Sequence, residues 1–245
     1  MVKSLDQKKF RQKYGLFRVE GNKVVSELLT SNWGIREIYA RSSWIEQNKA
    51  LYSKKVLTTL QVNEKELGRI SSQQNPDSVV AVVEIPKHQK LSLVDENQIK
   101  QGWILALDSI RDPGNLGTII RSADWFGFKG ILCAPDCVDQ FNPKVVRAAM
   151  GSLFRVPIIN QDLAAGFAEY GLPVYGADGN GLDSDSVDLP ASGILTIGNE
   201  SGGITQAVRE ACTAMLKIPG GGGAESLNAA IASSILMDRI TNRNN

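Results

Sequence analysis

The chain has 245 residues, of which 42% are hydrophobic and 22% charged, a composition typical of a globular protein of one large or two small domains. No apolar run approaches the roughly 20 residues of a membrane span, and no secretory apolar core follows the basic N-terminus. We therefore expect a cytoplasmic protein without membrane contact. Cys133, Cys137, Cys212 and the single His88 do not form a metal-ligand pattern, so we expect no metal and no histidine-dependent triad.

The net charge of +1 hides a difference between the two parts of the chain. Residues 1–90 carry 16 basic and 9 acidic residues, a net charge of +7, whereas the remainder carries 11 and 17, a net charge of −6. A basic part joined to an acidic part predicts that the first part faces a polyanion. The alternative is chance segregation of charges on solvated faces.

The first part alternates strand-like and helix-like patterns, which predicts a small α/β domain. The expected strands are Leu16–Glu20, Ile35–Ala40, Val56–Leu57 and Val79–Ile85. The expected helices are a short one within Met1–Tyr14, then Gly21–Thr30, Trp44–Tyr52 and Glu64–Ile70, the last capped by Asn63. Pro86–Leu91 lacks periodicity, so we place a linker there and divide the chain into domains 1–90 and 91–245.

The second part continues the alternation, which predicts a mostly parallel sheet with helices on both faces. The expected strands are Trp103–Leu107, Gly130–Ala134, Pro157–Ile159, Pro173–Ala177, Ile194–Ile197 and Met215–Ile218. The expected helices are Leu116–Phe126 with Asn115 as N-cap, Asn142–Met150, Asp162–Tyr170, Ile204–Cys212 and a C-terminal helix with Ser226 as N-cap. Gly179–Asp188 is expected to be a polar loop.

Three strand-to-helix loops of this part are rich in glycine, asparagine and small polar residues. They are Asp108–Asn115, Gly198–Gly203 and the segment that begins with Gly220–Gly223. Ligands of open α/β sheets bind beyond the carboxyl ends of the strands, where such loops meet. For the four glycines alone, a flexible surface loop before an amphipathic helix is an equal alternative.

Together, the three loops resemble the motifs of the SpoU (TrmH-type) RNA methyltransferases of the SPOUT superfamily. The first motif matches within Asp108–Ala123, especially at Pro113–Gly117 and Arg121. The second matches at Thr196–Glu200 with Gly203, and the third at Ile218–Pro219 and Ser226–Asn228. Asn142–Arg147 also resembles the family's intermediate segment. The residues before Pro86 more weakly resemble the small ribosomal-protein-like RNA-binding domain that often precedes this catalytic domain.

The resemblance implies a trefoil-knotted α/β catalytic domain and a homodimer formed through it. It implies S-adenosylmethionine as methyl donor and the ribose 2′-hydroxyl of structured RNA as acceptor, with ribosomal RNA preferred over transfer RNA. The four glycines and Ala229–Ala230 depart from the bulkier residues of many relatives, so the cofactor loop is expected to be more mobile when empty.

The resemblance also assigns roles to individual residues. The catalytic group implied by the motifs is Asn115, Arg121, Glu200, Ser226 and Asn228. The cofactor-binding group is Thr196, Ile197, Gly198, Ile218, Pro219, Leu227 and Ala229. From charge, the candidates for RNA contact are Arg11, Lys13, Arg18, Lys23, Lys144 and Arg147.

Each of these residues also has an ordinary structural explanation. Arg121 can pair with Asp124 on a solvated helix face, and Asn115 and Ser226 can be helix caps without a catalytic role. Glu200 can be an acidic residue of a first helical turn, where the helix dipole favours a negative charge. A guanidinium stays protonated, so we expect Arg121 to bind a phosphate or a developing alkoxide rather than to act as a base. A non-catalytic RNA-binding protein and a doubly wound nucleotide-binding enzyme are the alternatives, the latter without a Gly-x-Gly-x-x-Gly fingerprint.

Overall fold

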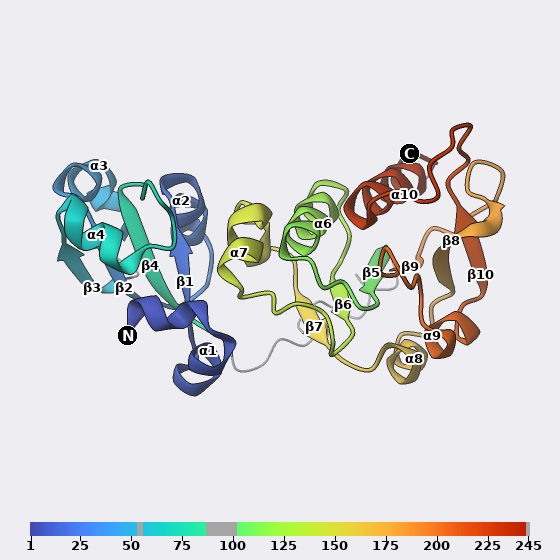
Figure 1. Cartoon of the computed structure of the whole chain (residues 1–245), viewed down its shortest axis with the longest axis horizontal. Coiled ribbons are helices and arrows are strands. Elements are labelled where there is room, and N and C mark those ends of the chain that lie inside the picture. Colours follow the sequence, from blue (N-terminus) through green and yellow to red (C-terminus); the bar gives the residue numbers. More distant parts are fainter. Residues whose placement is uncertain (53–55, 87–101, 244–245) are drawn as a thin grey trace. The chain divides into compact units, whose positions relative to one another are not determined.

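The computed structural model describes residues 1–52, 56–86 and 102–243 (Figure 1). The chain forms two compact units, which are treated separately: Met1–His88 with Asp139–Arg155, and Gln89–Val138 with Val156–Asn245. Apart from Pro86, the predicted linker and His88 lie outside the described residues. The expected boundary between residues 90 and 91 therefore stays a prediction.

The first unit contains a four-stranded sheet in the order β1 (Leu16–Glu20), β4 (Val79–Glu84), β2 (Ile35–Ala40) and β3 (Val56–Gln61). β4 runs antiparallel to β1 and β2, whereas β2 and β3 are parallel. The sheet is accompanied by η1 (Val2–Asp6), α1 (Lys8–Tyr14), α2 (Asn22–Thr30), α3 (Ser42–Tyr52) and α4 (Glu64–Ile70). The predicted elements of this part are confirmed, including the cap of α4, where Asn63 and Glu66 form a capping box.

Alternation along the strands gives each face of this sheet its own core. One face packs a cluster of aliphatic side chains against η1 and α4; the cluster contains Val2, Leu5, Leu16, Leu67, Val80 and Val82. Phe17 and Val19, the alternate residues of β1, are also fully buried. Successive side chains of a strand point to opposite faces of the sheet, so a strand covered on both faces buries nearly all of its side chains. This explains why valine-rich β4 lies inside the sheet, between β1 and β2.

The segment Asp139–Arg155 packs with the first unit, although the sequence pattern placed it in the second part. It contains α7 (Pro143–Ala149), whose N-cap is Asn142, and η3 (Ser152–Phe154). Phe141 and Phe154 contact Trp33 edge-on, with ring centroids 6.1 and 5.6 Å away. These aromatic contacts bury surface that no periodicity within the segment predicts.

The second unit contains a six-stranded sheet in which every pairing is parallel. The order is β10 (Ala214–Lys217), β8 (Val174–Asp183), β9 (Gly193–Ile197), β5 (Trp103–Leu107), β6 (Ile131–Cys133) and β7 (Ile158–Asn160). The strand order changes direction between β5 and β9, whose last residues, Leu107 and Ile197, are register partners. The loops that follow these two strands therefore begin side by side, at the position where such sheets bind ligands.

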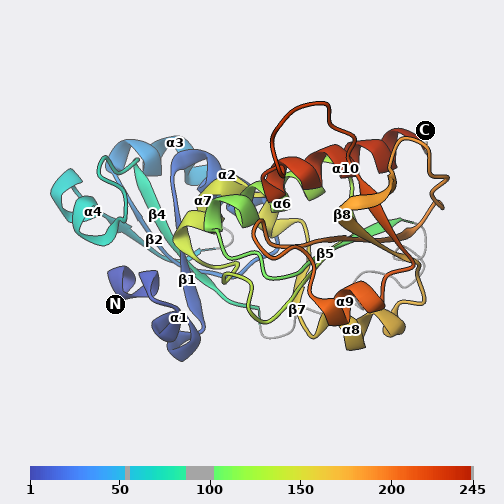
Figure 2. The same ribbon diagram turned by 45° about the vertical axis from the view of Figure 1, so that its right-hand side comes forward.

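Helices cover both faces of this sheet (Figures 1 and 2). α6 (Pro113–Trp125) and α10 (Ala229–Arg243) pack together on one face, where the Ser122 and Ser234 hydroxyls lie 2.8 Å apart. α8 (Leu163–Gly166), η4 (Phe167–Glu169) and α9 (Gln206–Glu210) lie on the other. The α/β architecture predicted from the sequence is confirmed, and no helix within the described ranges is long and apolar enough to cross a membrane.

One loop prediction in the second unit is wrong. Gly179–Asp188 was expected to be a polar loop, but β8 extends to Asp183. After a shift in register, Leu182 and Asp183 pair with Leu216 and Lys217 of β10. The hydrogen bonds of the neighbouring strand therefore hold a segment whose composition favours a turn.

Candidate active site

The loops after β5 and β9 are joined by hydrogen bonds between side chains and backbone. Asp108, a buried residue at the end of β5, accepts a hydrogen bond from the Thr205 backbone N–H at 2.7 Å. In the opposite direction, the side-chain amide of Asn199 donates to the Ser109 carbonyl at 2.9 Å. Each loop therefore supplies one side chain that fixes the backbone of the other.

Asn115 connects all three loops that the sequence singled out. Its side-chain N–H donates to the Glu200 carboxylate after β9, and its side-chain oxygen accepts from the Asn228 amide at 2.9 Å. Asn228 lies at the start of α10, after the four-glycine segment. The residues expected to cluster on the basis of motifs thus form a continuous chain of hydrogen bonds, which we call the Asn115 network: Glu200, Asn115 and Asn228.

The start of α10 determines the orientation of this network. The Asn228 side-chain oxygen accepts from the backbone N–H groups of Ala230 and Ile231, at 3.0 and 3.3 Å. Its amino group must therefore face Asn115, whose oxygen accepts it. This leaves the Asn115 amino group directed at Glu200. Capping of one helix thus sets the direction of every hydrogen bond up to the carboxylate.

The structure corrects two predicted helix caps. Asp112, not Asn115, is the N-cap of α6, and its carboxylate accepts from the Asn115 backbone N–H at 2.8 Å. Asn228, not Ser226, caps α10. The expected cap of α6 lies after the observed one in the chain, and the expected cap of α10 lies before it. As a result, the Asn115 side chain is available for the network instead of being used by its own helix.

Gly198 is required by the close approach of two backbone segments. The loop after β9 returns on itself, since Asn199 and Gly203 exchange backbone hydrogen bonds at 3.1 and 2.8 Å. A Cβ atom on Gly198 would lie 2.1 Å from the Gly203 carbonyl carbon and 2.4 Å from the Ile204 nitrogen. The obstacle is backbone, so a side chain at this position has to displace the loop.

We expect Gly198→Ala to destabilise the protein by about 1–3 kcal/mol, because overpacking has to be relieved by a backbone shift. Gly202→Ala is the matched control, since a Cβ there meets nothing within 4 Å. Urea unfolding monitored by circular dichroism measures both. Equal midpoints for the two variants would contradict the steric argument.

The residues expected to bind a cofactor have different environments. Thr196, Ile197 and Ala229 are buried, whereas Pro219 and Leu227 are exposed. The Thr196 hydroxyl has no hydrogen-bond partner in the described part of the chain. The segment between β10 and α10, dark red in Figure 2, loops away from the sheet. The structure brings Glu200 and Asn228 together through Asn115, but shows Leu227 facing solvent.

Arg121 and Ser226 are not part of the Asn115 network. Both are exposed, and neither side chain has a hydrogen-bond or ion-pair partner within the described residues. Arg121 lies six residues after Asn115 on α6, about 9 Å along the axis and on another side of the helix. The expected alternative, an ion pair with Asp124, is not formed.

Ser109 adds a strained and charged feature beside these loops. It has φ 62°, a left-handed conformation that is unusual for a residue other than glycine. Its hydroxyl donates to the Asp136 carboxylate at 2.6 Å, and the Arg111 guanidinium lies 3.1 Å from the same oxygen. The hydrogen bond from Ser109, followed by the hydrogen bond and the charge of Arg111, lowers the pKa of Asp136. The carboxylate thus holds both residues beside the end of β5.

The structure corrects the expected RNA contacts of Arg11 and Arg18. Both are buried: Arg11 donates to Asp139 at 2.9 Å from Nε, and Arg18 pairs with Asp6 and with Glu20, the latter at 2.7 Å. Carboxylates of the same unit hold both guanidinium groups, which are therefore not available to a phosphate. The other four candidates are exposed and all belong to this unit: Lys13, Lys23, Lys144 and Arg147.

Comparisons with known proteins match both parts of the chain. Residues 102–238 match the model of the SpoU rRNA Methylase family, which covers more than half of the chain, and residues 1–81 match an MRM3-like substrate binding domain. The chain belongs to the SpoU rRNA methylase family. The matched region contains every residue of the Asn115 network, so the family match and the geometry concern the same site.

Individual members of the SpoU family are similar over nearly their whole length. The 23S rRNA (guanosine(2553)-2′-O)-methyltransferase RlmP of Bacillus subtilis is 32% identical over 96% of this chain and 92% of its own. A 23S rRNA (uridine(2479)-2′-O)-methyltransferase of Streptomyces viridochromogenes is 30% identical over 95% of this chain and 85% of its own. The AdoMet-bound rRNA methyltransferase from Sinorhizobium meliloti superposes with a TM-score of 0.87 at 32% identity, covering 99% of this chain and 93% of that one.

Sequence reasoning missed the residues that hold the loops of this SpoU-family site together. Asp108 and Asn199 lie within the matched motifs, but no role was assigned to their side chains. A signal was present: an acidic residue directly after a fully apolar strand has to find a hydrogen-bond donor when it is buried. Here that donor is the backbone of the neighbouring loop.

Proposed function

We propose that this protein transfers a methyl group from S-adenosylmethionine to a ribose 2′-hydroxyl of ribosomal RNA. The observation that carries the proposal is the Asn115 network, which joins three separate motif loops through oriented side-chain hydrogen bonds. Two relatives act on different nucleotides of 23S rRNA, so the proposal names the RNA class and the reacting group. The reaction belongs in the cytoplasm, where ribosomal RNA is the abundant substrate.

In the proposed reaction, the protein mainly orients the two reactants. The bound cofactor supplies a methyl group on a positively charged sulfur. Positioning of reactants in a near-attack geometry supplies about 7–11 kcal/mol of barrier reduction. Glu200 provides the carboxylate of the Asn115 network, and an oxygen of this group can accept a hydrogen bond from the ribose hydroxyl as it loses its proton.

The residues around the network fit this cofactor chemically. The exposed segment Pro219–Asn228 offers backbone amides and carbonyls, and no atom lies within 4 Å of a Cβ built on any of the four glycines. Adenine and amino-acid groups can bind to such exposed backbone. The Thr196 hydroxyl, buried and without a hydrogen-bond partner among the described residues, lies one residue before the end of β9. In the proposal, Ile197, Gly198, Ile218, Pro219, Leu227 and Ala229 hold the cofactor with Thr196.

The first unit supplies the proposed contact with RNA. Lys13, Lys23, Lys144 and Arg147 are exposed on α1, α2 and α7 of this unit. Neutralisation of phosphates by such side chains makes affinity fall steeply with salt. The match to a substrate binding domain over residues 1–81 supports this division of labour.

We further propose a homodimer formed through α6 and α10. Trp125 at the end of α6 is 84% exposed and Ile231 on α10 is 53% exposed, and the two helices pack together. Tryptophan is enriched among the residues that contribute most to binding at protein interfaces, so the exposed Trp125 beside α10 favours an interface here. Arg121 precedes Trp125 by one helical turn, so it lies on the same face. The dimer proposal therefore places Arg121 at the interface, and we propose that it reaches the active site of the partner subunit.

Trp125→Glu is expected to weaken dimerisation at least about 30-fold, since loss of a central aromatic contact costs 2 kcal/mol or more. Light scattering coupled to size-exclusion chromatography measures the mass over a dilution series. Leu182→Glu introduces the same charge at another exposed apolar residue, 57% exposed, and should leave the dimer intact. A monomeric wild-type protein would refute the interface.

Two measurements test the proposed activity. Calorimetry with S-adenosylmethionine should show binding to the full-length protein. Mapping of 2′-O-methylation over total RNA, with and without the protein, should show one site that depends on it. If the cofactor does not bind and the methylation map is unchanged, the protein is an RNA-binding protein that has kept the fold.

A further inference from the structure

The first unit contains a cavity of about 860 Å³ that has no role in the methyl-transfer site. It lies at one end of the sheet, where β1 begins and β4 ends, and every residue that lines it belongs to this unit. The aromatic and charged side chains that line it are Tyr14, Glu27, Trp33, Arg36, Glu84, Phe154 and Arg155, of which Glu27 and Arg155 form an ion pair. A cavity of this size is within the range of small-ligand sites. Aromatic, basic and acidic groups therefore meet in one hollow.

Trp33 forms a rigid wall of this cavity. Its ring contacts Phe17, Phe141 and Phe154 in edge or T-shaped arrangements, with centroids 5.7, 6.1 and 5.6 Å away. The indole N–H donates to the Phe154 carbonyl at 3.2 Å. The side chain remains partly exposed. Such a ring cannot rotate freely, so a flat ligand that stacks on it loses little entropy to protein reorganisation.

Tyr14 provides a second aromatic surface at the same cavity. It ends α1, is 40% exposed and stacks on Phe10 at 6.1 Å with an interplanar angle of 10°. The Lys13 ammonium lies 5.5 Å from the Tyr14 ring centroid, and Lys9 lies 4.9 Å from that of Phe10. Alternation of stacked rings and ammonium groups along one helix face matches the bases and phosphates of a single strand.

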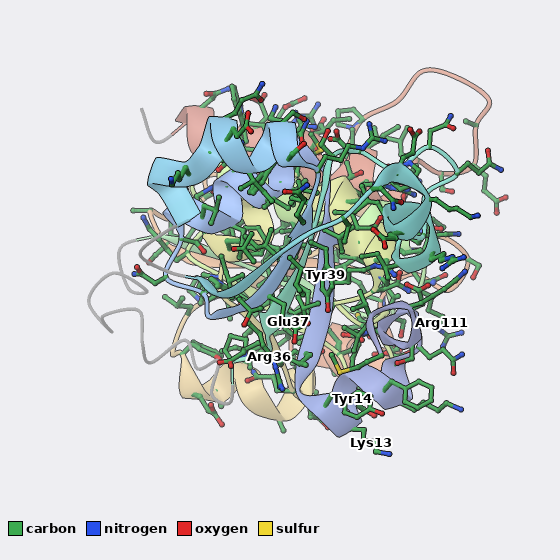
Figure 3. The ribbon with its side chains drawn as sticks, turned by 90° about the vertical axis from the view of Figure 1, so that its left-hand side faces the viewer. Lys13, Tyr14, Arg36, Glu37, Tyr39 and Arg111 are labelled. Carbon is green, nitrogen blue, oxygen red and sulfur yellow. The ribbon has the colours of Figure 1, made fainter. Side chains whose placement is uncertain are left out.

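Two charged groups complete the site. Arg36, half exposed, has only a 3.9 Å contact with Glu37 among the described residues, so most of its guanidinium is available. The Glu84 carboxylate is exposed beside Gly34, where it has no partner in the described chain. Figure 3 shows Lys13, Tyr14 and Arg36 on the face of this unit turned toward the viewer. A guanidinium suits a phosphate, and a carboxylate accepts from the exocyclic amine of a base.

We propose that this cavity binds an unpaired nucleotide of a single-stranded RNA segment. The base stacks on Tyr14 or Trp33, Arg36 and Lys13 contact the flanking phosphates, and Glu84 accepts a hydrogen bond from an exocyclic amine, which uracil lacks. The proposal rests on the proposed function, since it identifies which feature of the RNA the first unit recognises: an unstacked base in a loop.

The test uses the full-length protein and labelled eight-nucleotide oligoribonucleotides of adenine, cytosine or uracil. Fluorescence anisotropy at one fixed salt concentration should show tighter binding of the adenine and cytosine strands. Tyr14→Ala should weaken binding about 10-fold, because stacking contributes strongly per base. The affinity of Tyr14→Phe should stay within about twofold of the wild-type affinity, since this variant keeps the aromatic ring. Leu60→Ala, which truncates an apolar residue that is 41% exposed, is the matched control and should have no effect.

Charge variants test the other two contacts. Arg36→Ala should weaken the binding of all three oligonucleotides. It should also lower the slope of log affinity against log salt concentration by about 1, the value for one phosphate contact, whereas Lys65→Ala on α4 should change neither. Glu84→Gln should reduce the preference over the uracil strand. Wild-type affinity of Tyr14→Ala and Arg36→Ala, with melting temperatures unchanged, would overturn the proposal. Cofactor binding and rRNA methylation are measured separately, so a failure of this site is distinguishable from a failure of the proposed function.

Discussion

Replacement of Asn115 by aspartate is expected to lower kcat/KM for methyl transfer about 100-fold or more while the protein stays folded. The new side chain has the same shape, but its carboxylate has no N–H for Glu200 and places a second negative charge beside it. Loss of a preorganised donor in an active site costs about 10²–10³ in rate. Transfer of a radioactive methyl group from the cofactor to ribosomal RNA measures the effect. Activity within threefold of wild type would remove Asn115 from the mechanism.

Asn228 offers a control that separates the network from helix capping. Aspartate caps helices as well as asparagine does, so Asn228→Asp should keep α10 intact while it loses the donor to Asn115. We expect a reduced rate at an unchanged melting temperature. Asn228→Ala removes the cap as well and should cost about 1 kcal/mol of stability. If both variants lose stability equally, the side chain serves only the helix.

Replacement of Arg121 by lysine is expected to reduce kcat about 100-fold, although the charge is kept. A guanidinium binds a phosphate or an alkoxide through two parallel N–H groups, which an ammonium cannot reproduce. Arg69→Lys on α4 is the control, because this exposed arginine lies in the other unit. Near-normal turnover of Arg121→Lys would eliminate the proposed role.

Mixing two inactive variants tests whether Arg121 acts on the partner subunit. In a dimer of one Arg121→Ala chain and one Asn115→Asp chain, one site carries both changes and the other carries neither if the arginine acts across the interface. Random reassociation should then restore about a quarter of the wild-type activity. If Arg121 serves its own chain, every site carries a change and the mixture stays inactive.

The sequence predicted which helices and strands form better than it predicted where they begin and end. Buried strands such as Trp103–Leu107 and Ile194–Ile197 are recognisable because they are short and wholly apolar. The extension of β8 to Asp183 was not predictable, since it depends on pairing with β10 far along the chain. The assignment of Asp139–Arg155 to the first unit likewise depends on aromatic contacts between distant segments.

For the site, motif spacing predicted that Asn115, Glu200 and Asn228 belong together, but not how. A sequence pattern cannot state which residue caps a helix when Asp112 and Asn115 are both suitable, and this choice decides whether the Asn115 side chain is free. Charge alone failed for Arg18, because a buried arginine and a surface arginine look the same in a sequence. Burial depends on what packs above the strand, here η1 and α4.

The four consecutive glycines have a thermodynamic consequence for ligand uptake. Each glycine loses about 0.5–1 kcal/mol more conformational freedom on becoming ordered than alanine does. In the proposed cofactor loop, ordering of Gly220–Gly223 around a bound ligand therefore costs about 2–4 kcal/mol more conformational entropy than ordering of four alanines would. We therefore expect this segment to contribute an unfavourable entropy to cofactor binding, which calorimetry of the wild-type protein and of a variant with alanine at these four positions measures.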